Sequence, residues 1–147
     1  MSAETITTIS PTTNKPIVTR EGVADAELGA IPKRAEKAFL SFRRTSLAER
    51  QAIVKKALQL LRERQDELAK ELTEQMGRPI AYAAKEITTA VARGEYMLKI
   101  SEEALSDTPG EQESGFKRYI RKLPVGPVLV LFAWNVRVPE KWYTTLI

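Results

Sequence analysis

The sequence of 147 residues contains neither cysteine nor histidine. Without cysteine, the chain can form no disulfide bond, no thiolate nucleophile and no thiolate site for zinc or an iron–sulfur cluster. Without histidine, it lacks the side chain that most often acts as a general base near neutral pH and that most often binds a metal. Acid–base chemistry would therefore rest on Asp, Glu, Lys or Tyr, and we expect no metal site.

Long apolar segments and blocks of like charge are also missing. The longest apolar stretch, 123–136, is interrupted by Pro124, Gly126 and Pro127 and is too short to cross a bilayer as a helix. The first 20 residues have no apolar centre and do not resemble a signal or transit peptide. The net charge is only +4, and the basic residues are not interleaved with aromatic ones. We expect a cytoplasmic protein that binds neither nucleic acid nor membrane.

Two long amphipathic helices are the clearest elements that the sequence predicts. The first starts at the capping box "SLAE", in which Ser46 and Glu49 each bond the backbone N–H of the other. It ends at Gly77, because glycine readily adopts the left-handed conformation that closes a helix. Pro79 opens the second helix, which continues to about Leu105. The short connection predicts an antiparallel helical hairpin.

The patterns before this hairpin are weaker. Residues 1–24 are rich in Thr, Ser and Pro, and they predict an edge strand or coil with a turn at Asn14-Lys15. A helix is expected from Ala26 to Arg43, with Asp25 as its N-cap. Pro32 weakens the first half of that helix, because proline removes a backbone donor.

Two strand-like segments follow the hairpin, after a polar loop at 106–115. Residues 116–123 alternate between apolar and basic side chains, which predicts a half-exposed strand. Residues 128–134, "VLVLFAW", are apolar throughout, which is typical of a strand buried on both faces of a parallel sheet. Such a sheet needs more strands than this sequence encodes, so we expect this strand to be poorly supported.

Asn135 comes directly after the apolar strand. Ligands of open α/β sheets bind at the carboxyl ends of strands, and a carboxamide N–H there can stabilise an oxyanion. The alternative is a turn residue at a strand end, and position alone favours that alternative.

Three stretches carry a more specific signal: "AERQAIV" at 48–54, "MGRP" at 76–79 and "PVGPVLVLFAWN" at 124–135. In this order, from about Ile9 to Asn135, the chain resembles the amino-terminal part of the aldehyde dehydrogenase superfamily. Arg78 stands at the place of the family's lysine, and Ala133 replaces a usual proline. The resemblance implies an α/β fold in which a long helical hairpin and a few strands form an incomplete part of a Rossmann-like, dinucleotide-binding domain.

The resemblance also implies a reaction. The family oxidises aldehydes to carboxylic acids with NAD or NADP: a cysteine attacks the aldehyde, hydride passes to the nicotinamide, and a glutamate activates the water that releases the acid. By this resemblance, Asn135 is the catalytic residue that helps to hold the oxyanion. The backbone of Phe132, Ala133 and Trp134 would line the nicotinamide half of the cofactor.

Several functional parts of the family have no counterpart here. The nucleophilic cysteine is missing, and so are the family's glutamate motif, its glycine-containing cofactor motif and its ribose-binding lysine. Residues 136–147, "VRVPEKWYTTLI", do not continue the family pattern, so we expect a family segment at 1–135 and a non-family tail at 136–147. We predict a truncated aldehyde dehydrogenase that is inactive alone.

Other interpretations stay open. The chain can be a non-catalytic binding module that docks onto a full-length aldehyde dehydrogenase subunit, whereas an unrelated helical scaffold would have no need of the apolar strand.

The tail can reflect a genuine truncation or an error in the gene model. Codons such as GTACGT for Val136-Arg137 resemble an intron donor site, so we favour a retained intron, which transcript sequencing across Asn135 tests.

Overall fold

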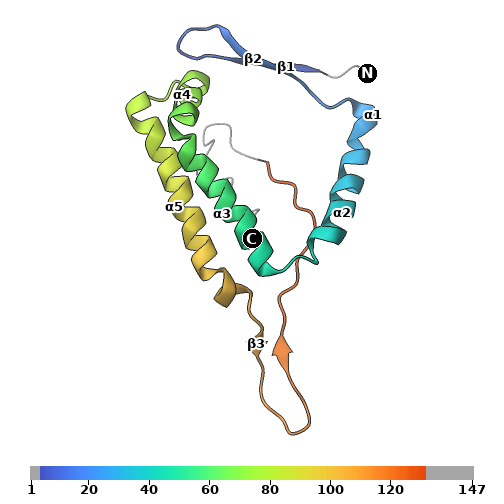
Figure 1. Cartoon of the computed structure of the whole chain (residues 1–147). Coiled ribbons are helices and arrows are strands. Elements are labelled where there is room, and N and C mark those ends of the chain that lie inside the picture. Colours follow the sequence, from blue (N-terminus) through green and yellow to red (C-terminus); the bar gives the residue numbers. More distant parts are fainter. Residues whose placement is uncertain (1–3, 132–147) are drawn as a thin grey trace.

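The computed structural model describes residues 4–131, in which a β-hairpin lies at the end of a helical unit and two further helices, at 25–28 and 30–42, stand apart from that unit (Figure 1). Along the chain the elements are β1 (Thr5–Ile9), β2 (Pro16–Glu21), α1 (Asp25–Leu28), α2 (Ala30–Phe42), α3 (Leu47–Glu63), α4 (Gln65–Met76), α5 (Ile80–Leu105), β3 (Thr108–Pro109) and β4 (Tyr119–Ile120). None of the helices among residues 4–131 combines the length and hydrophobicity that a bilayer span requires.

The predicted helical hairpin is confirmed, with α3 and α4 as its first arm and α5 as its second. Its first arm bends at Arg64, whose φ of −104° and ψ of 18° are not helical. The N–H of Arg64 still donates to Leu60 O at 3.0 Å, and Leu68 N–H donates to Arg64 O at 3.0 Å. Because the hydrogen bonds continue across it, the bend joins the two helices without a loop.

The core of the described residues lies within this helical unit. The buried apolar side chains form one cluster between α3 and α5 and a second between α4 and α5, with these members: Val54, Leu58, Leu61, Ile87 and Val91 in the first, and Ala69, Leu72 and Ala83 in the second. Burying such side chains is the main favourable term in folding. The helical unit therefore supplies most of the stability of residues 4–131.

Gly94 brings α5 close to α3. A Cβ atom at Gly94 would lie 2.6 Å from Leu58 Cδ2 and 3.1 Å from Leu58 Cδ1. Carbon atoms do not approach so closely without displacement. The absence of a side chain at this position therefore creates the space that the Leu58 side chain occupies.

The ends of the hairpin follow the predicted signals. The Ser46 N–H donates to Glu49 Oε2 at 2.7 Å, and the Glu49 N–H donates to Ser46 Oγ at 3.2 Å, which completes the capping box. The hydrogen bonds from the backbone and hydroxyl of Ser46 lower the pKa of the Glu49 carboxyl. Gly77 has a φ of 69° and closes α4 in the left-handed conformation.

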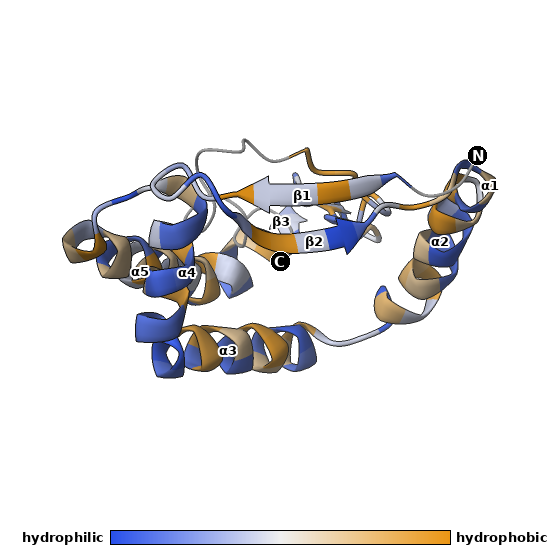
Figure 2. Cartoon of the chain, turned by 90° about the horizontal axis from the view of Figure 1, so that it is seen from above, coloured by the Kyte–Doolittle hydropathy of each residue, from blue (hydrophilic) through white to orange (hydrophobic). Residues whose placement is uncertain are grey.

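Strands β1 and β2 form the antiparallel hairpin that lies across the end of the helical unit (Figure 1). Asn14 has a φ of 55° in its turn, at the predicted place. The turn packs against the α4–α5 connection, since a Cβ atom at Gly77 would lie 3.1 Å from Pro11 Cγ. Seen from above, α1 and α2 stand apart from α3 (Figure 2).

The helix predicted from Ala26 to Arg43 differs in detail from the one observed. It is two helices, and their N-caps are Ala24 and Gly29, neither of which makes a side-chain cap bond. Asp25 is therefore the first helical residue, not the cap as predicted. Because α2 begins at Ala30, Pro32 falls in its first turn, where a missing N–H leaves no hydrogen bond unmade.

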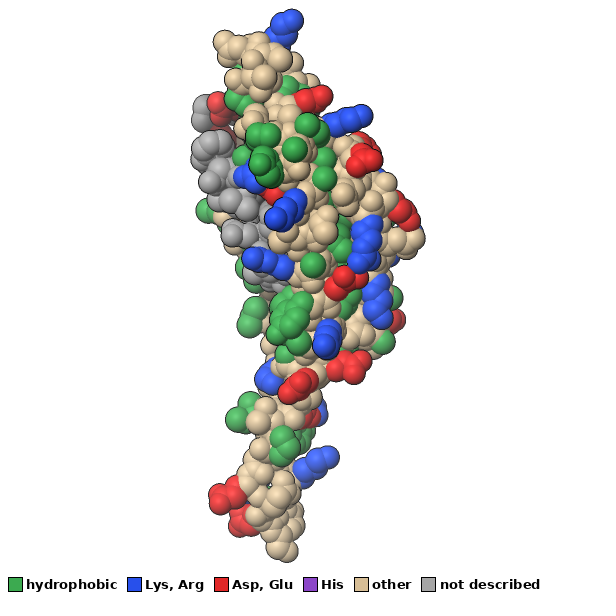
Figure 3. All heavy atoms as spheres, turned by 90° about the vertical axis from the view of Figure 1, so that its left-hand side faces the viewer, with side chains coloured by type: hydrophobic (Ala, Val, Ile, Leu, Met, Phe, Trp, Pro, Cys, Tyr) green, Lys and Arg blue, Asp and Glu red, His purple; other side chains and the backbone are tan. Residues whose placement is uncertain are grey.

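The strands predicted after the hairpin are shorter than expected. Of residues 116–123 only β4 is a strand, and it pairs antiparallel with β3. The resulting ribbon projects as a narrow arm (Figure 3). Arg121 Nη2 donates to Asp107 Oδ2 at 2.7 Å at its base, and this hydrogen bond lowers the pKa of Asp107. The ion pair is exposed, so it adds little stability.

The apolar strand predicted at 128–134 is not a strand over its described part, 128–131. Leu129 and Leu131 are 86% and 87% exposed, and Val125 before them is 94% exposed. A strand needs a hydrogen-bonded neighbour, and no strand within residues 4–131 lies beside this segment. The expectation of poor support for this segment is therefore confirmed over 128–131.

Candidate functional site

The four residues that the sequence singles out for function lie outside the described residues. These are Asn135, for the oxyanion, and Phe132, Ala133 and Trp134, for the cofactor. Their roles stay predictions, and so does the boundary after Asn135. The segment that leads to them, 121–131, has no regular secondary structure and is largely exposed.

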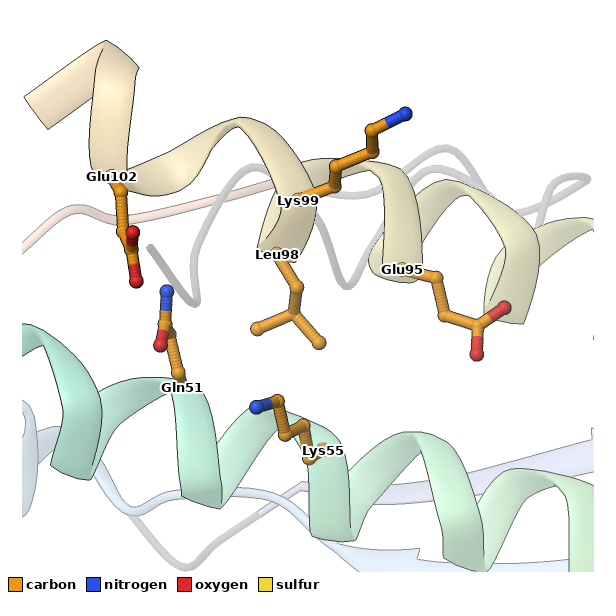
Figure 4. Close-up of a pocket in the computed structure, with 6 residues that line it drawn as sticks. All are labelled: Gln51, Lys55, Glu95, Leu98, Lys99 and Glu102. Carbon is orange, nitrogen blue, oxygen red and sulfur yellow. The ribbon is translucent and has the colours of Figure 1, made fainter.

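A groove of about 440 Å³ lies between α3 and α5 (Figure 4). Leu98 points from α5 toward α3, whereas the Lys99 ammonium group points away from it. The lining residues are Gln51, Lys55, Glu95, Leu98, Lys99 and Glu102. The two lysines and two glutamates balance in charge, so the groove has no net preference for an anion or a cation.

Hydrogen bonds at this groove connect the two helices. Gln51 Nε2 donates to Ser101 Oγ at 2.8 Å, and Ser101 Oγ donates to Leu98 O at 2.8 Å. Ser101 is buried, so its hydroxyl needs these partners. The Gln51 amide therefore forms a hydrogen bond that joins α3 to α5.

A second hollow of about 290 Å³ lies further along the same two helices and shares Glu95. Arg62 Nη2 donates to Glu95 Oε1 at 2.5 Å across it, between two half-exposed side chains. No group of three or more acidic side chains within residues 4–131 is placed to hold a metal ion. Arg62 and Glu95 thus link α3 to α5.

Glu86 is a largely covered charged residue that the sequence alone did not indicate. Its side chain is only 11% exposed and forms an ion pair with Arg78. Arg78 is the residue of "MGRP" that stands where the family that this sequence resembles has a lysine. Glu86 Oε2 is buried without a hydrogen-bond partner. The pair joins the α4–α5 connection to the second turn of α5, so Arg78 acts here as a structural residue. Sequence reasoning noted Arg78 in "MGRP" but had no signal for its partner.

Within residues 4–131, the protein has a helical layer and two two-stranded sheets, but no extended sheet. The sequence model of the aldehyde dehydrogenase family matches residues 1–138. This chain belongs to the aldehyde dehydrogenase family.

Curated relatives agree with this assignment. The chain is 32% identical over 133 residues to the succinate-semialdehyde dehydrogenase [NADP(+)] of Mycobacterium avium, which covers 88% of this chain and 28% of that protein. It is 32% identical over 136 residues to the glutarate-semialdehyde dehydrogenase of Pseudomonas putida, covering 91% of this chain and 28% of that protein. The chain therefore spans about 28% of the length of these relatives.

Solved structures lead to the same conclusion. The succinic semialdehyde dehydrogenase of Streptococcus pyogenes, solved in complex with NADP+, superposes with a TM-score of 0.67 at 29% identity, over 74% of this chain and 24% of that one. An NAD-dependent benzaldehyde dehydrogenase from Corynebacterium glutamicum gives a TM-score of 0.68 over 78% and 25%, and its 24% identity supports the fold alone. The predicted fold class, an incomplete part of an aldehyde dehydrogenase domain, is confirmed.

Proposed function

We propose that this chain is the amino-terminal part of a cytoplasmic, NAD(P)-dependent aldehyde dehydrogenase, and that its 147 residues do not oxidise aldehydes alone. The observation that carries the proposal is the family match over residues 1–138 in a sequence without cysteine. The family's reaction begins with attack by a cysteine thiolate, and this sequence contains no cysteine.

The relatives suggest the class of substrate for the complete enzyme. Those from Mycobacterium avium and Pseudomonas putida are named for succinate semialdehyde and glutarate semialdehyde. We therefore propose short aldehydes with a terminal carboxylate as substrates and NAD or NADP as the oxidant. Asn135 then holds the oxyanion, and Phe132, Ala133 and Trp134 line the cofactor.

Inactivity of the chain alone is tested directly. The purified 147-residue chain is incubated with succinate semialdehyde or glutarate semialdehyde and with NAD or NADP, and reduced nicotinamide is followed by absorbance. We expect no rate above that of buffer, whereas the Mycobacterium avium enzyme serves as the active reference. Turnover by the chain alone would overturn the proposal.

The role of Asn135 is tested in a chimera in which residues 1–135 replace the matching part of the Mycobacterium avium enzyme. Loss of one oxyanion donor lowers kcat by about 10²–10³-fold, so we expect that loss for Asn135→Ala. Gln59→Ala is the control, because Gln59 is exposed on α3 and, among the described residues, bonds its helical neighbours Lys56 and Glu63. Equal activity of the two variants would remove the catalytic role of Asn135.

One observation favours the alternative that the chain docks onto a full-length aldehyde dehydrogenase subunit. Val125, Leu129 and Leu131 are almost fully exposed along one segment, and contiguous exposed apolar side chains mark interaction sites. Co-purification of the tagged chain with the full-length relative tests this alternative. A chain that elutes alone would argue against it.

A further inference from the structure

The connection between α2 and α3 places two arginines directly before two hydroxyl groups. Its sequence is Arg43-Arg44-Thr45-Ser46, and Leu47 begins α3. In Figure 2 it is the coil that leads from α2 to the start of α3. Ser46 is the only serine or threonine of the sequence that has basic residues both three and two positions before it. The pattern therefore singles out one hydroxyl group of this chain.

Both arginines are available to a partner. Each is exposed, and neither forms an ion pair with a carboxylate among residues 4–131. The Arg43 guanidinium lies 5.5 Å from the centre of the Phe39 ring, which is a weak contact at an exposed site. Guanidinium groups bind carboxylates through two parallel hydrogen bonds. Arg43 and Arg44 thus offer a recognition surface to a partner with acidic side chains.

Of the two hydroxyl groups, that of Ser46 is the more accessible. Ser46 is exposed, whereas Thr45 is half-buried and its hydroxyl donates to Phe42 O at 2.7 Å. Ser46 Oγ donates to Glu49 Oε2 at 2.8 Å and accepts from the Glu49 N–H at 3.2 Å. These bonds belong to the first turn of α3. Because helix ends fray, they open more readily than bonds in the middle of a helix.

We propose that Ser46 is a phosphorylation site for a protein kinase that selects basic residues before its target serine. Ser46 Oγ attacks the γ-phosphorus of ATP, and a new P–O bond forms while the bond from that phosphorus to the β–γ bridging oxygen breaks. ADP leaves, and the hydroxyl proton passes to the catalytic base of the kinase. The site lies apart from the residues of the proposed function and does not depend on it.

Glu49, three positions after Ser46, would suit a kinase that selects acidic residues instead. Its carboxylate, however, already accepts from the Ser46 N–H at 2.7 Å and from Ser46 Oγ at 2.8 Å. The two arginines would also meet the basic cleft of such a kinase, and like charges in contact are unfavourable. The charges around Ser46 therefore favour a kinase with an acidic cleft.

The start of α3 can accommodate the phosphate. The N–H groups of a first helical turn point toward the N-terminus and bind phosphate well. Arg50 lies one turn into α3, where its N–H donates to Ser46 O at 3.2 Å, and its Nε atom is buried without a hydrogen-bond partner among residues 4–131. Helical side chains lean toward the N-terminus, so Arg50 is on the side of the phosphate. The phosphate displaces the Glu49 carboxylate, because both are negative.

The test incubates the purified 147-residue chain with ATP and the catalytic subunit of cyclic-AMP-dependent protein kinase, which selects such basic patterns. Tandem mass spectrometry measures the phosphate and locates it. We expect a single phosphate, on Ser46, and none on Ser46→Ala. The double variant Arg43→Gln, Arg44→Gln should slow incorporation by about tenfold or more, because charge-assisted hydrogen bonds to the kinase are lost.

The double variant Lys33→Gln, Arg34→Gln is the matched control. It removes the same charge from two exposed positions of α2 and leaves the connection intact. Charges on the surface that lie more than a Debye length from the target are largely screened. This control should therefore change the rate of incorporation by less than about twofold.

A second measurement follows the modified chain. If the phosphate caps α3, the phosphorylated chain should have a higher urea midpoint than Ser46→Ala. Arg50→Gln should lower the midpoint of the phosphorylated chain more than that of the unmodified chain, because only the phosphate needs the guanidinium as a partner.

Four results would overturn the proposal. They are a phosphate on Thr45 or elsewhere in place of Ser46, equal slowing by the two double variants, faster labelling by a kinase that selects acidic residues, and a phosphorylated chain no more stable than Ser46→Ala. Failure of the proposed function would appear separately, as aldehyde oxidation by the chain alone.

Discussion

At the scale of single residues, Gly94 determines how closely α5 can lie to α3. Replacing it with valine would place methyl groups where the Leu58 side chain now lies. Overpacking of this kind costs about 1–3 kcal/mol, so we expect Gly94→Val to lower the free energy of unfolding by that amount in urea titrations. Ala92→Val, on the exposed side of the same helix, controls for the helix propensity of valine.

The coupling between the two positions makes this prediction specific. Leu58→Ala removes the side chain that a Cβ atom at Gly94 would meet, so Gly94→Val should cost less in that background than in the wild type. If valine at position 94 were equally costly in both backgrounds, steric conflict with Leu58 would not be the cause.

Residues with local signals were predictable, and those with distant partners were not. Ser46 and Gly77 act on backbone groups a few residues away, and the sequence places both correctly. The ion pair of Arg78 with Glu86 depends on how the α4–α5 connection meets the second turn of α5. No spacing rule predicted it, because the geometry of that connection is set by tertiary packing.

At the scale of elements, the start of α3 depends on its capping box. Ser46→Ala removes the oxygen that accepts from the Glu49 N–H, and loss of such a cap costs about 1 kcal/mol. We expect this loss as a lower urea midpoint. Thr45→Ala is the control, because the Thr45 hydroxyl donates to Phe42 O and not to α3.

The same capping box predicts a dependence on pH. Hydrogen bonds from Ser46 lower the pKa of Glu49 below its ordinary value of 4.5 in the folded chain. The unfolded chain therefore binds the proton more readily, so the contribution of Glu49 is present above about pH 4.5 and is lost as the pH falls through the folded pKa. In urea titrations at falling pH, Glu49→Gln should lack this loss. A variant that loses stability as steeply as the wild type would contradict the assignment.

Helices were predicted better than strands at this scale. The hairpin carries its own caps and a helical apolar period, so its two arms appear where expected, with an unforeseen bend at Arg64. The segment 128–134 was predicted as a strand from its apolar side chains alone. Strand formation needs a neighbour, and none of the strands within residues 4–131 pairs with 128–131. The candidate site residues, 132–135, lie beyond the described residues, so their placement stays a prediction.

At the scale of the whole molecule, the segment 123–131 exposes apolar side chains without burying them. Exposed apolar segments promote association. We expect the double variant Leu129→Lys, Leu131→Lys to bind less of a hydrophobic dye and to aggregate more slowly in light scattering. Its free energy of unfolding should stay within about 0.5 kcal/mol, because surface substitutions rarely change more. A large loss of stability would mean that the segment packs against the helical unit.

The position of the core along the chain has a consequence for synthesis. Every buried apolar residue of the described core lies between Val54 and Val91. A nascent chain whose residues up to Leu105 have left the ribosome therefore already holds the whole of that core. Helical units with such local contacts fold within microseconds to milliseconds, whereas translation adds about 5–20 residues per second. The helical unit thus completes its folding before the apolar segment 123–131 emerges, and it is present as a preformed surface when that segment does.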